Sequence, residues 1–234
     1  MNESPQNIPG TNPLLKKGGV HPKTGTVELV NTTKRFNRDF IFFKVNYTFK
    51  TQRSYAITGP NGSGKSTLLQ AIAGSLQLSE GKIIYKSSNG VDEIQPEKIH
   101  QQVSIAAPYL ELIEEMTAKE FLNFHKQFKP LFEGLGVEDI LTEIGLENAM
   151  DKQIRYYSSG MKQRVKLAQA VFSDVPVLLL DEPCTNLDKT GYDLYHSLIE
   201  KYCRHKLIIV SSNDANEMSF CDERINIIDH KRPA

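Results

Sequence analysis

The stretch that decides the fold is Gly59-Pro60-Asn61-Gly62-Ser63-Gly64-Lys65-Ser66-Thr67. It fits the pattern G-x-x-x-x-G-K-[ST] of a phosphate-binding loop (P-loop). The preceding residues, 54–58, are typical of a short buried strand, and residues 68–73 are typical of a helix. This order makes an anion site, because free backbone N–H groups and the helix dipole favour negative charge at a helix start. The alternative is a glycine-rich turn with a solvated lysine, which the strand and helix on either side disfavour.

The role of each residue in this stretch follows from the chemistry of phosphate binding. We expect the glycines to let the backbone close around phosphates without Cβ clashes. Lys65 should reach the β- and γ-phosphates, and Ser66 should place its hydroxyl on Mg²⁺. The predicted cofactor-binding set in this loop is Gly59, Pro60, Asn61, Gly62, Ser63, Gly64, Lys65, Ser66 and Thr67.

Composition is that of an ordinary globular protein. The chain has 234 residues, of which 39% are hydrophobic and 24% are charged, and its formal net charge is +0. The neutral charge disfavours a strongly basic nucleic-acid binder, so we expect no nucleic-acid partner. No apolar run approaches the ~18 residues that span a bilayer, and the N-terminus lacks a secretory apolar core. We therefore expect a cytoplasmic protein whose three cysteines stay reduced.

The order of elements predicts an α/β fold with two additions. Residues 1–25 carry four prolines, four glycines and no aromatic residue, and are predicted to be a flexible leader. Residues 27–30 and the alternating residues 45–49 predict an antiparallel β-rich region before the P-loop. Phe36 lies between these strands, in a polar turn. It could stack on an adenine ring or plug the loop, and position alone does not separate the two.

The middle of the chain is predicted to be helical. Thr117 and Glu120 form a capping-box pattern, so a helix should follow over about 118–128, with a second over 135–144. A third should begin at the segment 157–164. Strands are expected over 81–85, 103–106, 177–180, 207–210 and 225–228, and a short helix after a second capping box at Asp214–Glu217. The expected architecture is a mostly parallel sheet with an inserted helical subdomain at about 108–165.

Two acids follow the most apolar of these strands. Leu178-Leu179-Leu180-Asp181-Glu182 is a Walker B pattern. A P-loop enzyme needs an acid at a neighbouring strand end to hold Mg²⁺, and Asp181 fits that role. Glu182 is placed to polarise the attacking water. The alternative is a pair of surface acids, which the upstream P-loop disfavours.

Two further segments, 157–161 and 185–188, together with the P-loop and the Walker B acids resemble the motifs of ABC-type ATPases, the ATP-binding subunits of ABC transporters. Tyr157-Ser158-Ser159-Gly160-Met161 resembles the family's signature motif Leu-Ser-Gly-Gly-Gln, and lies between the P-loop and the Walker B acids as in that family. Thr185-Asn186-Leu187-Asp188 resembles the D-loop. The resemblance covers about residues 26–230 and implies one ATP-binding domain over 26–234. It also adds Ser158, Ser159, Gly160 and Asp188 to the cofactor-binding residues.

The resemblance implies partners as well as a ligand. The signature is a second anion site at a helix start, and in the family each ATP lies between one P-loop and the signature of a second subunit. It therefore implies ATP and Mg²⁺ as cofactors, a homo- or heterodimer, and a separate transmembrane permease subunit that docks on the helical insertion. Such a protein lies on the cytoplasmic face of the inner (cell) membrane. Met116, Phe121, Leu122 and Phe124 are the candidate docking residues, although helical spacing is more often core.

Two positions depart from the family pattern. Asn213 stands where the family has a γ-phosphate-contacting His, and Pro108 where it has a Gln that touches Mg²⁺. Asn213 can donate a hydrogen bond to a phosphate oxygen but does not titrate near neutral pH. We expect slow ATP hydrolysis with Glu182, Lys65 and Asn213 as catalytic residues and Ser66 and Asp181 on the metal. The alternatives are an ABC ATPase without a transport role and a weakly active regulatory nucleotide-binding subunit.

Overall fold

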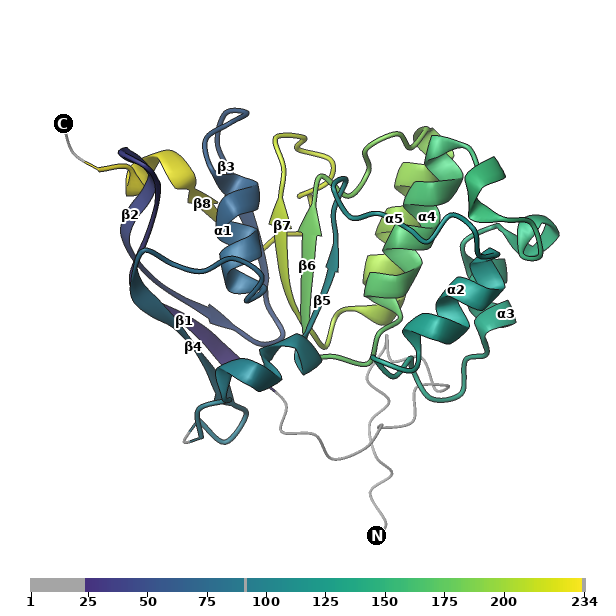
Figure 1. Cartoon of the computed structure of the whole chain (residues 1–234), viewed down its shortest axis with the longest axis horizontal. Coiled ribbons are helices and arrows are strands. Elements are labelled where there is room, and N and C mark those ends of the chain that lie inside the picture. The colour runs from purple at the N-terminus through teal and green to yellow at the C-terminus, as the bar shows by residue number, and fades with distance from the viewer. Residues whose placement is uncertain (1–23, 91, 233–234) are drawn as a thin grey trace, which may run out of the picture.

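Two β-sheets and a group of helices make up the computed structural model, which describes residues 24–90 and 92–232 (Figure 1). The first sheet is antiparallel, with strand order β2-β1-β4. Its strands are β1 (Thr24–Phe36), β2 (Asp39–Lys50) and β4 (Glu80–Ser87). The predicted antiparallel region is therefore present, and β4, which follows the P-loop in sequence, completes it.

The second sheet is parallel and has the order β5-β6-β7-β3-β8. Every pairing within it is parallel. Its strands are β5 (Val103–Ala106), β6 (Val177–Asp181), β7 (Leu207–Ser211), β3 (Ser54–Thr58) and β8 (Glu223–Asn226). Parallel strands buried on both faces read as continuous apolar runs, which is why these short strands could be predicted.

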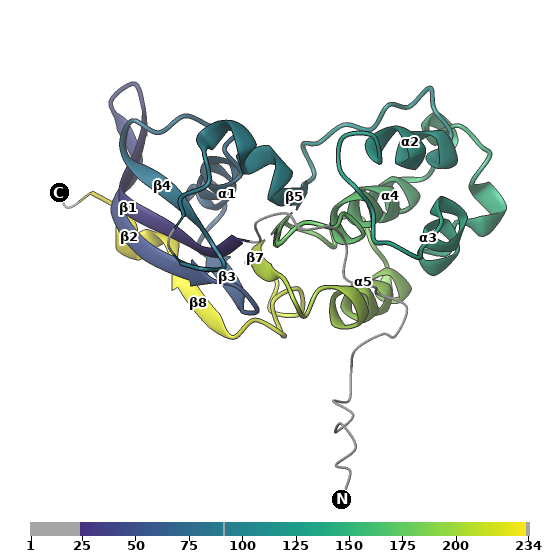
Figure 2. The same cartoon turned by 90° about the horizontal axis from the view of Figure 1, so that it is seen from below.

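The helices fall into two groups on opposite faces of the parallel sheet. Helix α1 (Lys65–Ile72) lies between this sheet and the antiparallel one, as Figure 2 shows from below. On the other side lie α2 (Ala118–His125), α3 (Val137–Glu143), α4 (Ser159–Val171) and α5 (Lys189–Tyr202). Short 3-10 helices span Pro96–Gln101, Glu147–Ala149, Ile154–Tyr156 and Ile227–His230.

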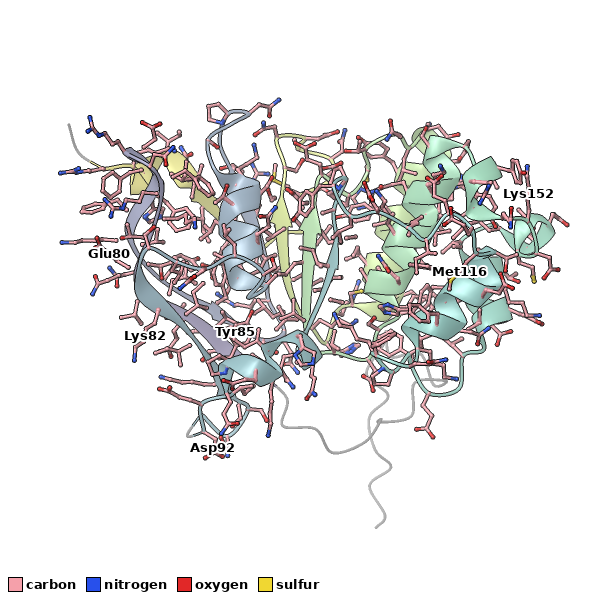
Figure 3. All side chains as sticks on the ribbon, in the orientation of Figure 1. Glu80, Lys82, Tyr85, Asp92, Met116 and Lys152 are labelled. Atoms are coloured by element: carbon pink, nitrogen blue, oxygen red, sulfur yellow. The ribbon has the colours of Figure 1, made fainter. Side chains whose placement is uncertain are left out.

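Alternate side chains of β6 point to opposite faces of the sheet and pack in two different hydrophobic cores. Leu179 packs in the core that contains α1 and the antiparallel sheet, whereas Leu178 and Leu180 pack in the core that contains α4 and α5. Tyr85 of β4 donates a hydrogen bond to the carbonyl oxygen of Ile72 and so ties the antiparallel sheet to the end of α1 (Figure 3). The sheet thus divides the molecule into a P-loop half and a helical half.

Several predicted boundaries need correction. Thr24 and Gly25 belong to β1, and the rest of the predicted leader lies outside the described residues. Strand β1 runs through Phe36, so this residue ends a strand and does not lie in the turn. The last strand is Glu223–Asn226, and residues 227–230 form a 3-10 helix.

One predicted helix is absent. The capping box at Thr117 and Glu120 forms as expected, because the Glu120 N–H donates to Thr117 Oγ1 over 3.1 Å. The same pattern at Asp214–Glu217 is followed by turns and no helix. The Glu217 carboxylate instead points inward, where it accepts a hydrogen bond of 2.8 Å from the Cys184 backbone N–H.

Candidate functional site

The ends of three neighbouring strands form the floor of the site. Ile57 of β3 is in register with Ser211 of β7, which is in register with Asp181 of β6. The Ser212 N–H donates to the Ile57 carbonyl over 3.3 Å, and the Glu182 N–H donates to the Ser211 carbonyl over 2.8 Å. The P-loop, Asn213 and the Walker B acids therefore leave the sheet side by side at its carboxyl edge, where open α/β sheets bind ligands.

Glycines shape the P-loop through positive φ angles and close contacts. Gly59, Gly62 and Gly64 have φ values of 144°, 75° and 106°. A Cβ on Gly64 would lie 2.4 Å from Ile41 Cγ2, and one on Gly59 would lie 2.7 Å from Ile227 Cγ2. Only glycine fits such backbone without strain. Strand β2 and the segment after β8 therefore pack directly on the loop.

Lys65 is held over its own loop. The side chain is buried, and its Nζ donates hydrogen bonds to the carbonyls of Gly59 over 2.8 Å and of Pro60 over 3.4 Å. Gly64 precedes α1 as its N-cap and supplies no side-chain cap, so the first backbone N–H groups of α1 keep their donors for a ligand. Ser63 Oγ is also buried and has no partner among the described residues. The loop thus presents one buried cation with several donors.

Asp181 carries a buried oxygen that fits a cation. The residue is 2% exposed, and its Oδ1 has no hydrogen-bond partner within residues 24–90 and 92–232. An unpaired carboxylate oxygen in such a place costs free energy unless a ligand satisfies it. Oxygen donors are the ligands that Mg²⁺ prefers. The donor set of Asp181 and the Ser66 hydroxyl therefore fits this ion.

Glu182 and Asn213 lie at the rim of the same edge. Glu182 has a φ of 42°, and its carbonyl accepts a hydrogen bond of 2.9 Å from Thr185 Oγ1. An acidic residue with positive φ is uncommon and is a feature of turns and active sites. Asn213 Nδ2 donates to Asn61 Oδ1 over 2.7 Å, so the residue at the family's His position contacts the P-loop.

The signature residues begin a different helix. Ser158 is the N-cap of α4, and its Oγ accepts a hydrogen bond of 3.2 Å from the Met161 N–H. Ser158 and Ser159 are exposed. A Cβ on Gly160 would lie 3.1 Å from the Asn186 carbonyl oxygen, so the start of α4 packs on the D-loop.

Asp188 and Phe36, both predicted to bind the nucleotide, make contacts within the subunit as well. Asp188 is the N-cap of α5 and accepts hydrogen bonds from Thr190 Oγ1 and the Gly191 N–H, which lower its pKa. Phe36 is 49% exposed, with the Lys34 ammonium 4.7 Å from its ring centroid. An exposed ring is no plug beneath a loop, so that alternative for Phe36 is wrong.

Sequence reasoning missed Tyr109. Pro108, at the family's Gln position, offers only a carbonyl, which accepts a hydrogen bond of 2.8 Å from Lys166 Nζ. Burial raises the pKa of the neighbouring Tyr109 phenol, a hydrogen bond with the Gln70 side chain opposes this, and the charge of Asp181 adds to the rise. The Tyr109 phenol is therefore close enough to Asp181 to be influenced by its charge. A tyrosine one position past the expected Gln gave no signal in the sequence.

Comparisons with known proteins agree with this arrangement. The sequence model of the ABC transporter family matches residues 42–185. The chain belongs to the ABC transporter ATP-binding family. It is 31% identical to the uncharacterized ABC transporter ATP-binding protein YybJ of Bacillus subtilis, over 84% of this chain and 89% of that protein. It is 32% identical to the ABC transporter ATP-binding protein NatA of the same organism, over 78% and 76%.

Solved structures share the fold. A putative ABC transporter ATP-binding protein from Pyrococcus furiosus superposes with a TM-score of 0.74 at 20% identity, covering 89% of this chain and all of that one. The P-loop fold with its two sheets and helical region is therefore confirmed. The chain is an ATP-binding subunit of an ABC transporter, and membership of this family implies ATP hydrolysis. Among the described residues, no helix is long and apolar enough to cross a bilayer.

Proposed function

We propose that the carboxyl edge of the parallel sheet binds Mg·ATP and hydrolyses it slowly between two ATP-binding subunits. The observation that carries this proposal is the alignment of Ile57, Ser211 and Asp181 in neighbouring strands. This register supports a single site formed by the P-loop, the Walker B acids and Asn213. Relatives named as ABC transporter ATP-binding proteins support the same ligand.

Each site residue takes one role in this proposal. Backbone N–H groups of residues 59–67 and the Lys65 ammonium bind the phosphates. Ser66 and Asp181 would hold Mg²⁺, which would supply positive charge to offset that of the phosphates. Glu182 accepts a proton from water as the water oxygen bonds to the γ-phosphorus and ADP leaves. Asn213 donates its amide to the γ-phosphate, and the exposed Phe36 ring stacks on adenine.

A second subunit is needed because the two anion sites lie apart. Helix α1 packs in the core on one face of the sheet, and α4 packs in the core on the other. Their N-termini therefore do not converge on one phosphate group. Two copies or sister chains packed head to tail bring the P-loop of one against Ser158, Ser159, Gly160 and the D-loop Asp188 of the other. ATP then lies in the interface.

The helical subdomain is the proposed docking surface for a transmembrane permease. Phe121 and Leu122 are core residues, 6% and 0% exposed, so they do not line this surface as the sequence suggested. Phe124 remains on it, paired edge-to-face with the exposed Phe128 at a centroid distance of 5.0 Å. Met116 lies beside α2 (Figure 3). Phe124 also lines a pocket at α2, together with Thr117, Lys119, Glu120, Asn123, Gln127 and Asp151.

This docking places the protein on the cytoplasmic face of the membrane. Relatives support a transporter partner, since one is named as the lantibiotic transport ATP-binding protein SrtF of Streptococcus pyogenes, at 27% identity over 86% of each chain. An exposed aromatic pair of this kind is typical of a surface that binds another protein.

Replacing Glu182 with Gln tests the catalytic assignment. The amide keeps the size of the side chain but cannot accept the proton, so we expect steady-state ATP turnover to fall at least about tenfold. Nucleotide affinity should stay within about twofold, because Glu182 is assigned no contact with the ground-state phosphates. Phosphate release and equilibrium titration with Mg·ATP measure the two quantities.

The same variant tests the dimer. With hydrolysis slowed, Mg·ATP should hold two subunits together, which sedimentation velocity detects as a shift from monomer to dimer. Unchanged ATP turnover would contradict the assignment of Glu182 as the proton acceptor. If this variant stays monomeric at saturating Mg·ATP, both alone and with co-purified chains, the proposal of an ATP site shared between two subunits is wrong.

A further inference from the structure

The segment after β8 lies directly on the P-loop. Strand β8 pairs with β3, and the residue that follows it, Ile227, is fully buried. Ile227 occupies the space beside Gly59, where an added Cβ would lie 2.7 Å from its Cγ2 atom. Figure 1 shows this last described segment in yellow beside β2. The last described segment of the chain therefore packs against the P-loop.

Lys231 joins three parts of the molecule at that point. Its Nζ donates one hydrogen bond of 2.7 Å to the carbonyl of Ser63 in the P-loop and another of 2.7 Å to the carbonyl of Ile41 in β2. The Ile41 side chain itself contacts Gly64. Hydrogen bonds from a cation to carbonyl oxygens are among the stronger ones in proteins. The ammonium thus fixes the P-loop, β2 and the C-terminal segment relative to one another.

The bond to Ser63 also sets the direction of a backbone donor. The Ser63 carbonyl and the Gly64 N–H belong to the same peptide unit, and no peptide bond of the described chain is cis. In a planar trans peptide the carbonyl and the N–H point to opposite sides. Because Lys231 holds the carbonyl, the Gly64 N–H points away from Lys231.

The peptides on either side of this one have hydrogen bonds of their own, from the Ser63 N–H to the Pro60 carbonyl over 3.0 Å and from the Leu68 N–H to the Gly64 carbonyl over 2.9 Å. Gly64 has a φ of 106° and lacks the side-chain cap that would fix the start of α1. Glycine explores backbone conformations that other residues avoid, so its flanking peptide can rotate. The buried Ser63 hydroxyl has no partner within the described residues. The bond from Lys231 is the one that holds the Ser63 carbonyl of this peptide directly.

We propose that Lys231 is a positioning residue for phosphate binding, which holds the Ser63 carbonyl so that the Gly64 N–H is ready to donate to a bound phosphate. This rests on the proposed function of the P-loop as the triphosphate site. Lys231 acts through the loop backbone and not on the reacting atoms. The ligand does not have to order a donor that is already oriented, so we expect loss of Lys231 to weaken the binding of phosphate ligands.

Binding of Mg·ATP and of magnesium pyrophosphate to the full chain tests the proposal. Lys231→Met keeps the apolar stem and removes the donor. We expect its dissociation constants for both ligands to rise roughly tenfold, the size of one hydrogen bond to a charged group. Because pyrophosphate has no base or sugar, a matching loss for both ligands assigns the effect to the phosphate loop. Isothermal titration calorimetry gives the constants without turnover of pyrophosphate.

Arg232→Met is the matched control. Arg232 is the adjacent residue with the same charge, but its guanidinium lies 4.7 Å from the Phe40 ring centroid. Removing it should leave both constants within twofold. Equal losses in the two variants would reduce the effect to general charge and overturn the proposal.

Two further results decide the remaining cases. Lys231→Arg retains donors for both carbonyls and should bind within about threefold of the parent, which separates positioning from a folding defect even if Lys231→Met melts early. If Lys231→Met weakens ATP but not pyrophosphate, Lys231 acts on the β2 side and the proposal is wrong. If the parent chain itself binds neither ligand, the proposed function fails first.

Discussion

The two helix starts assigned to phosphate binding are built differently. Helix α1 begins after Gly64, whose left-handed backbone carries no side-chain cap, and its first residue, Lys65, is buried. Helix α4 begins after Ser158, an extended residue whose hydroxyl already accepts the Met161 N–H. The first turn of a helix has backbone donors without intrahelical partners. At α1 they remain free for a ligand, whereas at α4 one is already in use.

This difference suggests which part of ATP binding each subunit of a dimer contributes. The P-loop is enclosed by Ile41, Ile227 and Lys231, so its geometry exists before any partner arrives. Ser158 and Ser159 are exposed and form only a surface. We therefore expect a single subunit to bind nucleotide through the P-loop and the signature to contribute only in a dimer.

The same substitution at both helix starts should have the most unequal effects. In Gly64→Ala the new Cβ would lie 2.4 Å from Ile41 Cγ2 on a backbone with φ of 106°. We expect Mg·ATP affinity to fall by about 100-fold, because strain of this kind costs on the order of 1–3 kcal/mol. Gly160→Ala meets only the Asn186 carbonyl at 3.1 Å and has no positive φ. It should leave the affinity of the monomer within about twofold.

Equilibrium titration of dilute protein with Mg·ATP measures both, and thermal melting shows whether each variant is folded. If Gly64→Ala binds like the parent, β2 does not constrain the P-loop and the contrast between the two helix starts disappears. If Gly160→Ala weakens binding to the monomer as much as Gly64→Ala does, the signature belongs to the same half-site as the P-loop.

Acid should weaken the helical half of the molecule through His125. The side chain lies on α2, with Nε2 2.9 Å from Ser173 Oγ just after α4. Burial lowers its pKa to about 4, and the charge of Lys129 adds to this effect. An unfolded chain has a His pKa near 6.5, so between pH 6.5 and pH 4 the unfolded state binds more protons and folding stability falls as pH falls. We expect a loss of about 1–2 kcal/mol between pH 7 and pH 5.

Urea unfolding at pH 7 and pH 5 measures this loss. His125→Gln should remove most of the difference between the two pH values, while His100→Gln, at an exposed position, should leave it unchanged. A parent and a His125→Gln protein with the same pH dependence would show that other groups carry the acid sensitivity.

The sequence predicts what local chemistry determines. The P-loop, the apolar strands and the cap at Thr117 depend on neighbours within a few residues, so their patterns are sufficient. The same capping pattern at Asp214–Glu217 gives no helix, because Glu217 is 3% exposed and its carboxylate accepts the Cys184 N–H from another loop. A tertiary hydrogen bond of this kind outweighs a local propensity and leaves no trace in the local pattern.

The restraint on the P-loop was beyond prediction for a similar reason. Lys231 reaches Ser63 across 168 positions and Ile41 across 190. A lysine in a polar C-terminal stretch is ordinarily a solvated residue, and nothing in its neighbours distinguishes it. The same holds for Tyr109, which follows β5 in the chain and comes within the influence of the Asp181 charge because β5 pairs with β6. The motif residues could be named from sequence, but not the residues that hold them in place.

Ser158 offers the finest test of the contrast, because Ser158→Ala removes both its cap and its proposed contact, whereas Ser158→Asp keeps the cap and opposes the contact. Ser158→Ala removes the bond to the Met161 N–H and should lower stability by about 1 kcal/mol, the usual cost of losing an N-cap. Ser158→Asp caps a helix as well as Ser does and places favourable negative charge at its start, so stability should be retained. A carboxylate facing a γ-phosphate is repelled, however, so Ser158→Asp should abolish the Mg·ATP-driven dimer in the Glu182→Gln background. Sedimentation velocity and urea unfolding report the two effects, and a Ser158→Asp protein that dimerises normally would place the signature away from the phosphates. Because Ser158→Asp is expected to keep the stability of the parent, loss of folding cannot imitate its loss of the dimer.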